Sequence, residues 1–285
     1  MTLGSLWVWY LENHAKPRKR TWQADARRWE SHLKAWQHEP IGNLTRAEIV
    51  ALHAEKKKAI GPCGANHVLE QLRHMLQMAV EQGWINANPA SGIKRFPRTS
   101  RDRFLSEAEL PRFLEAVRSL RNSNARDFFL LALMTGARRG NVMAMRWSEL
   151  DLDAGVWRIP GDKSKNKADM LVALVEPAVA ILRARKRSSP WVFPSHSKCG
   201  HYLWPKDAWK AVLKKSGIEG LRTHDLRRTL ASWQVTIGSN IAVIGSSLGH
   251  KSLASTAVYA RTQIEQVKAS VDSAVQAMLK SDSQK

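Results

Sequence analysis

The sequence of 285 residues is poor in cysteine, in acidic residues and in long hydrophobic runs, and each shortage excludes a class of protein. Two cysteines, Cys63 and Cys199, cannot build a disulfide framework, and neither lies in a paired metal-binding motif. The longest apolar run, 128–134, has seven residues, whereas a transmembrane helix needs about 20. The first ten residues place no basic leader before an apolar stretch, unlike a secretory signal. A cytoplasmic protein without a membrane partner is therefore expected.

The scarcity of acidic residues leaves a large positive charge. With 45 Lys+Arg against 25 Asp+Glu, the formal net charge is +20. A folded chain with this excess favours a polyanionic partner, usually nucleic acid, over a protein that is merely basic. An anionic membrane surface is the rival partner, but the sequence has no basic amphipathic segment with a Trp or Phe face to support it. Residues 1–97 and 98–285 are both basic, so both parts of the chain are expected to touch one DNA duplex.

The length predicts two domains, and the 44% hydrophobic content with 12 dispersed Trp residues predicts folded ones. Apolar residues at helical spacing mark residues 3–13, 21–36, 46–59 and 65–82. Thr45 and Glu48 form a capping-box pattern, and Gly61 to Gly64 break the helical pattern. A basic segment that contains proline, 93–103, then marks the domain boundary. The predicted division is a helical domain over 1–97, a linker over 98–103 and a second domain over 104–285.

The second domain is predicted to be mainly α-helical with a small three-stranded β-sheet. The expected strands are 148–152, 156–159 and 170–175, with a basic hairpin tip over 161–168 between the last two. The expected helices cover about 107–120, 124–134, 139–146, 177–186, 205–216, 224–236, 240–248, 252–260 and 262–279.

Four short motifs carry residue types suited to phosphate chemistry. They are Arg138 at a turn into a helix, the hairpin lysines at 163, 165 and 167, the His224–Arg227 pair, and Leu248-Gly249-His250 followed by Tyr259. His224 and Arg227 share a helix face near its start, where free backbone N–H groups favour an anion. Taken singly, each could equally be a surface arginine or a core histidine. Taken together, they could bind one phosphodiester.

The order and spacing of these motifs resemble the tyrosine recombinases, the phage integrase family, from about Leu3 to Leu279. The resemblance is carried by TGARRGNVMAMRW (135–147), KSKNKADMLVAL (163–174), THDLRRTLAS (223–232) and LGHKSLASTAVYA (248–260). Residues 64–96 are similar to that family's core-binding domain. The resemblance implies a helical, SAM-like core-binding domain followed by an α-rich catalytic domain with the small sheet.

The resemblance also implies a role for each residue. Arg138 and Arg227 would bind the non-bridging oxygens of the scissile phosphate, with His224 beside them and His250 holding the same phosphate. Tyr259 would be the nucleophile, whereas Tyr10 and Tyr202 follow no such motif and are expected to be structural. The general acid would be Lys165, counted back from the strand at Val172, with Lys163 as the alternative.

The chemistry is consistent with these roles. A tyrosine hydroxyl has a pKa near 10 and attacks a phosphodiester poorly unless its anion is stabilised. Two arginines neutralise the phosphate and the added charge of the transition state, and a lysine can protonate the leaving 5′ oxygen. Neither metal nor ATP nor any other cofactor is required. Asn141 departs from the family, because many members carry there an acidic residue that supports the first arginine.

The function implied by the resemblance is site-specific integration or excision of a phage or other mobile element through a 3′-phosphotyrosine intermediate. The partners would be double-stranded DNA, a homotetramer assembled on two DNA sites, and accessory DNA-bending or directionality proteins. The protein would be bacterial or phage-encoded and associated with the nucleoid. An arm-site DNA-binding domain is expected to be missing or truncated, because core-binding helices already begin at Leu3, so that either the protein works without arm sites or the chain is a fragment. A type IB topoisomerase and a non-enzymatic DNA-binding regulator are the rival functions.

Overall fold

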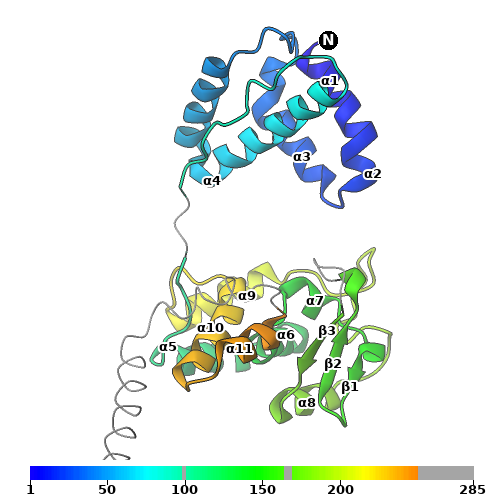
Figure 1. The fold of residues 1–285 in the computed structure, drawn as a ribbon. Coiled ribbons are helices and arrows are strands. Elements are labelled where there is room, and N and C mark those ends of the chain that lie inside the picture. The colour runs from blue at the N-terminus through cyan, green and yellow to red at the C-terminus, as the bar shows by residue number, and fades with distance from the viewer. Residues whose placement is uncertain (98–100, 164–168, 250–285) are drawn as a thin grey trace, which may run out of the picture. The chain divides into compact units, whose positions relative to one another are not determined.

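A computed structural model describes residues 1–97, 101–163 and 169–249, and the chain divides into two compact units, Met1–Arg101 and Asp102–Lys285 (Figure 1). Each unit is described by itself. Within the described ranges, no helix is long and apolar enough to cross a bilayer.

The first unit is entirely helical in its regular elements. These are α1 (Leu3–Tyr10), a π-helix (Leu11–Ala15), α2 (Lys16–Arg18), α3 (Trp22–Arg28), a second π-helix (Trp29–Leu33), a 3₁₀ turn (Lys34–Trp36) and α4 (Arg46–Glu81). The predicted capping box at Thr45 and Glu48 is confirmed, since each side chain bonds the other residue's backbone N–H. The predicted break is also present, because Gly61 has a φ of 75° and kinks α4. The two helices predicted over 46–82 are therefore present on either side of this kink, under the single label α4.

A polar network lies inside this helical unit. The Tyr10 hydroxyl donates to Asp25 at 2.9 Å, and Lys19 and Arg28 form ion pairs with the same carboxylate. Burial alone would raise the pKa of Asp25, but the hydrogen bonds from Lys19 and Tyr10 outweigh it and hold the pKa below its usual value. Tyr10 is therefore a buried structural residue, as its position outside any active-site motif predicted.

The second unit packs its helices against each other and against a three-stranded sheet. The elements are α5 (Glu109–Arg118), α6 (Ser123–Thr135), α7 (Arg139–Met143), a 3₁₀ turn (Trp147–Glu149), β1 (Leu150–Asp151), β2 (Val156–Ile159), a 3₁₀ turn (Gly161–Lys163), β3 (Met170–Ala173), α8 (Glu176–Arg183), α9 (Lys206–Ser216), α10 (Thr223–Thr236) and α11 (Ile241–Leu248). The strands are antiparallel in the order β1-β2-β3, with Trp157 opposite Val172. The predicted mainly α-helical fold with a small sheet is confirmed, although the first strand has only two residues. The helices expected over 252–260 and 262–279 lie outside the described residues.

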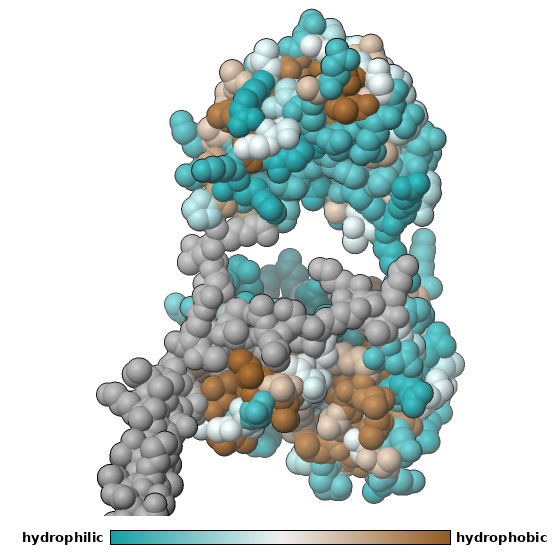
Figure 2. Space-filling view, in the orientation of Figure 1, coloured by the Kyte–Doolittle hydropathy of each residue, from teal (hydrophilic) through white to brown (hydrophobic). Residues whose placement is uncertain are grey.

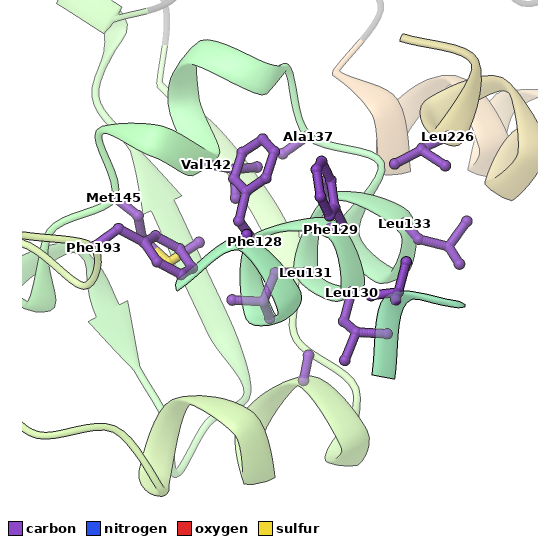
Figure 3. Packing of buried hydrophobic residues seen from close by; sticks show 14 of the residues in the cluster. Phe128, Phe129, Leu130, Leu131, Leu133, Ala137, Val142, Met145, Phe193 and Leu226 are labelled. Atoms are coloured by element: carbon purple, nitrogen blue, oxygen red, sulfur yellow. The ribbon is translucent and has the colours of Figure 1, made fainter. Parts of the chain in front are cut away.

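Helix α6 forms the centre of this core. Its run of apolar residues leaves the side chains of Phe128, Phe129 and Leu131 fully buried. Figure 3 shows these side chains near Val142 and Phe193, which come from other elements of the unit. Burying a side chain of this size stabilises the fold by roughly 1.5–3 kcal/mol. This packing holds the end of α6 in place, and with it the turn that leads to Arg138.

Candidate active site

Arg138 lies at the tight turn between α6 and α7. Gly136 ends α6 with a φ of 59°, and a Cβ atom there would lie 2.9 Å from side-chain atoms of both Leu230 and Leu248. Only glycine fits this turn without a shift of its neighbours. Arg138 follows as the N-cap residue of α7 and is half-buried, and its side chain makes no hydrogen bond or ion pair with another described residue. Its guanidinium is therefore available to a ligand.

Arg227 is buried, and its side chain joins the ends of helices α6 and α11 through hydrogen bonds. Only 4% of its surface is exposed. One guanidinium nitrogen donates to the Gly136 carbonyl at 2.7 Å and the other to the Leu248 carbonyl at 2.5 Å. These carbonyls lie two residues before Arg138 and two residues before His250. Arginine has five N–H donors, more than the two bonds named here use, and both of these bonds reach backbone carbonyls.

His224 is the second residue of α10 and lies within the electrostatic reach of both arginines. Removal of water from around its ring is the main cause that lowers its pKa, and the positive charges of Arg227, Arg228 and Arg138 lower it further. The residue itself is still exposed at the surface. The structure therefore brings Arg138, His224 and Arg227 together, although they are up to 89 positions apart in the sequence. A neutral imidazole at this point can donate or accept one hydrogen bond.

Asn141 follows Arg138 by three residues, and its side chain is buried. Its backbone N–H donates to the Arg138 carbonyl at 2.8 Å, while its amide Nδ2 has no hydrogen-bond partner among the described residues. An unpaired buried amide is costly, by roughly 1–3 kcal/mol. No described contact links the Asn141 side chain to the Arg138 guanidinium.

The two candidate lysines differ in what the structure describes. Lys163 is engaged: its Nζ donates to the Ala144 carbonyl at 3.0 Å, forms an ion pair with Glu149, and lies 5.5 Å from the Trp191 ring centroid. Lys165 belongs to 164–168 and lies outside the described residues. A lysine held by a carboxylate and a carbonyl is less free to reach a leaving group. This ion pair could not be predicted from the residues near Lys163 in the sequence.

The third strand contacts the turn that leads to His250. Gly249 ends α11 with a φ of 60°, and a Cβ atom there would lie 2.2 Å from the Met170 sulfur. Met170 begins β3, directly after the hairpin tip that contains Lys165. The start of β3 and the end of α11 are therefore packed together through Met170 and Gly249. His250 and Tyr259 themselves lie outside the described residues.

The remaining described tyrosine, Tyr202, is a packing residue. Its ring centroid lies 6.3 Å from that of Phe193 and 6.5 Å from that of Phe128, and burial raises the pKa of its hydroxyl. A raised pKa makes a weaker nucleophile at neutral pH. Within the described part of the chain, no three His, Cys, Asp or Glu side chains are placed to hold a metal ion.

A pocket of about 560 Å³ opens beside Arg138 and His224. Its other lining residues are Arg139, Gly140, Trp204, Trp209, Leu221, Arg222 and Thr223. The sequence did not indicate Trp204 or Arg222 as site residues, because neither belongs to one of the four motifs. Arg139 directly follows Arg138, and that adjacency was the one signal available.

Comparison with known proteins agrees with the motifs. The model of the phage integrase family matches residues 103–266, which is more than half of the chain. The chain is 32% identical over 199 residues to the integrase of Salmonella phage P22, covering 65% of this chain and 50% of that protein. It is 30% identical over 225 residues to the prophage integrase IntA of Escherichia coli (strain K12), covering 74% and 54%. The chain thus spans about half the length of the curated relatives it matches.

Solved structures share the fold. A lambda integrase(75-356) dimer bound to a COC′ core site superposes with a TM-score of 0.75 at 19% identity, covering 93% of this chain and 97% of that one. The Tn1549 transposon integrase in complex with a circular intermediate DNA gives a TM-score of 0.78 at 15% identity, covering 95% and 99%. A lambda integrase tetramer bound to a Holliday junction gives 0.71 at 20% identity, covering 88% and 78%.

Proposed function

The chain belongs to the phage integrase family, and on this premise we propose that it is a site-specific DNA recombinase that integrates or excises a mobile element. The observation that carries the proposal is the proximity of Arg138, His224 and Arg227: the first two line one pocket, and the buried Arg227 joins the Gly136 and Leu248 carbonyls, which precede Arg138 and His250 in the chain. A protein that only binds DNA has no need of such a convergence beside a tyrosine motif.

In the proposed reaction, Arg138 and Arg227 bind the non-bridging oxygens of the scissile phosphate, with His224 and His250 holding the same group. The Tyr259 hydroxyl gives its proton to water and its oxygen attacks the phosphorus, while the bond to the 5′ oxygen breaks. Lys165 donates a proton to that leaving oxygen. The products are a 3′-phosphotyrosine and a free 5′-hydroxyl, so the bond energy is conserved without ATP. The 5′-hydroxyl of a partner strand then attacks the phosphotyrosine, forms the new phosphodiester and releases Tyr259.

The arginines supply most of the charge stabilisation in this account. The guanidinium of Arg138 has no described partner to displace, and its half-buried position lets it meet a phosphate with little further loss of water. Arginine binds phosphate with two parallel N–H donors, which lysine cannot do. Loss of one such donor in other enzymes slows the reaction by roughly 10²–10³-fold.

The partner of both units is proposed to be one DNA duplex. Residues 1–97 would serve as the core-binding domain, 98–103 as a basic linker that also lies on phosphate, and 104–285 as the catalytic domain. Both parts carry more basic than acidic residues, which supports contact from each. A cytoplasmic location at the nucleoid follows from this partner.

Assembly is proposed as four copies on two DNA sites, with accessory DNA-bending or directionality proteins as further partners. The segment 262–279 would dock on a neighbouring copy. An apolar surface on the second unit supports this, because Ile237 and Val243 are 76% and 58% exposed. Figure 2 shows hydrophobic residues gathered on this face of the second unit. Exposed apolar groups of this kind are typical of protein contact sites.

The test is strand exchange between two DNA sites. DNA from either side of the gene is placed as two sites on one supercoiled plasmid, and the protein is added without metal or ATP. The proposal predicts a recombinant plasmid whose junctions are joined within the sites. Relaxation of the supercoils without exchange would point to a topoisomerase, and binding without any strand cleavage would point to a regulator.

A further inference from the structure

The pocket beside Arg138 and His224 is also lined by Arg139, Trp204 and Arg222, none of which takes part in the proposed reaction. None of the described residues that line the pocket is acidic, whereas three are arginines. A nearby described carboxylate, that of Asp225, is buried behind this lining and accepts from the Arg222 backbone N–H at 2.8 Å, so the lining itself presents positive charge to an anion.

Trp204 provides a rigid, flat wall in this pocket. Its ring centroid lies 6.1 Å from that of Trp209, 6.1 Å from that of Phe129 and 6.3 Å from that of Phe128. Phe128 and Phe129 are fully buried and Trp209 is 7% exposed, so three core rings hold the half-buried Trp204 in place. Because the indole is held in place, a side chain that packs against it has a defined position before a ligand binds.

Arg139 stacks on that wall. Its guanidinium carbon lies 5.0 Å from the centre of the Trp204 ring, and the side chain makes no hydrogen bond or ion pair with another described residue. Stacking uses the face of the guanidinium and leaves its N–H edges free for a planar, two-donor contact. Trp204 therefore orients the Arg139 guanidinium, and no described residue occupies its N–H donors. This arrangement is suited to binding a phosphate.

We propose that Arg139, positioned by Trp204, binds a second phosphate of the same DNA, next to the scissile one held by Arg138. This inference rests on the proposed function for the identity of its ligand. The second contact would fix the DNA strand at two successive phosphates, the scissile one and its neighbour. A strand held at two neighbouring phosphates cannot pivot about Arg138.

The test measures affinity for a duplex DNA of unrelated sequence between about 50 and 200 mM salt, for the full chain and for Arg139→Ala. Each phosphate contact contributes about 0.9 to the slope of log affinity against log salt. The slope should fall by about 0.9 in Arg139→Ala, so the variant should lose ~3.5-fold less affinity over this fourfold salt range than the wild type. Arg183→Ala is the matched control, because Arg183 is an exposed arginine on α8, at the other end of the unit from α7 in Figure 1, and its removal changes the charge equally.

The positioning by Trp204 has its own readout. Trp204→Leu removes the flat wall and should weaken DNA binding, whereas the double variant Arg139→Ala/Trp204→Leu should bind no more weakly than Arg139→Ala alone. Trp204→Phe keeps an aromatic face and should restore most of the affinity. Additive losses in the double variant would contradict the positioning role.

The outcomes separate this inference from the proposed function. An unchanged slope in Arg139→Ala, or equal changes in Arg139→Ala and Arg183→Ala, would overturn the second phosphate contact. A lower melting temperature of Arg139→Ala with an unchanged slope would show that the stacked pair serves stability alone. A wild-type protein that binds DNA with the full slope, yet never forms a covalent adduct, would refute the function and leave this contact standing.

Discussion

Replacement of Arg227 should destabilise the second unit as well as abolish its chemistry. The side chain is 4% exposed and its two described hydrogen bonds join the Gly136 and Leu248 carbonyls. A hydrogen bond to a charged group contributes about 1.5–3 kcal/mol, so the loss of two such bonds in Arg227→Ala should lower the free energy of unfolding by roughly 3–6 kcal/mol. For a unit of this size, each kcal/mol lowers the melting temperature by about 2–4 °C, which gives a shift on the order of 10 °C.

Arg138→Ala is the matched control for this prediction. Arg138 carries the same charge and is proposed to bind the same phosphate, but it is half-buried and bonds to no described residue. Its replacement should change the unfolding free energy by less than about 1 kcal/mol, because substitutions away from buried networks have small effects. Both variants should fail to form a covalent adduct.

The assay is scanning calorimetry of the full chain, with the transition of the second unit compared among wild type, Arg227→Ala, Arg227→Lys and Arg138→Ala. Arg227→Lys should recover part of the stability, since one ammonium group can reach one of the two carbonyls. The reasoning is refuted if Arg227→Ala melts within 2 °C of the wild type, or if Arg138→Ala is destabilised as much as Arg227→Ala.

Three further predictions follow from charge and proton transfer. The bonds from Arg103 lower the pKa of Glu109 to about 2, below its unfolded value of 4.5. Glu109→Gln should therefore lower the free energy of unfolding, measured in urea at pH 7, by about 2–3 kcal/mol. The difference in stability between wild type and variant should close as the pH falls from about 4.5 to 2. A cost that is constant over this pH range would contradict it. Lys165→Ala should cleave normal DNA slowly but regain its rate on DNA with a 5′-phosphorothiolate leaving group, and rescue of Lys163→Ala instead would assign the general acid to Lys163. The affinity of the wild-type protein for duplex DNA should fall steeply between about 50 and 200 mM salt, and an affinity that hardly changes would exclude phosphate contacts from both units.

The local features of the fold could be predicted from the sequence because they depend on neighbouring residues. The capping box at Thr45, the break at Gly61 and the turn that carries Arg138 all follow from residue types within a few positions of each other. The second and third strands were located closely for the same reason. The length of the first strand was not predicted correctly, because pairing over two residues depends on the partner strand rather than on local preference.

The contacts of the site residues could not be predicted, because they join distant parts of the chain. Arg227 bonds to a carbonyl 91 positions away, and nothing in the motif shows that it ties two loops. The partner of Lys163 is Glu149, which precedes it by 14 positions and lies outside the hairpin. Arg139 and Trp204 meet only because the aromatic core places them there. Motif spacing indicates which residues meet a phosphate, but not which of them also hold the site together.

The most direct test of the proposed reaction is removal of one oxygen atom, by the variant Tyr259→Phe. End-labelled DNA that carries a nick close to the cleavage site traps the covalent intermediate, because the short fragment diffuses away and cannot be rejoined. On a denaturing gel, the wild-type protein should give a protein–DNA adduct, and Tyr259→Phe should give none while it binds the same DNA with near-normal affinity. An adduct from Tyr259→Phe would show that another residue is the nucleophile, with Tyr202 the next to test, and would contradict the mechanism.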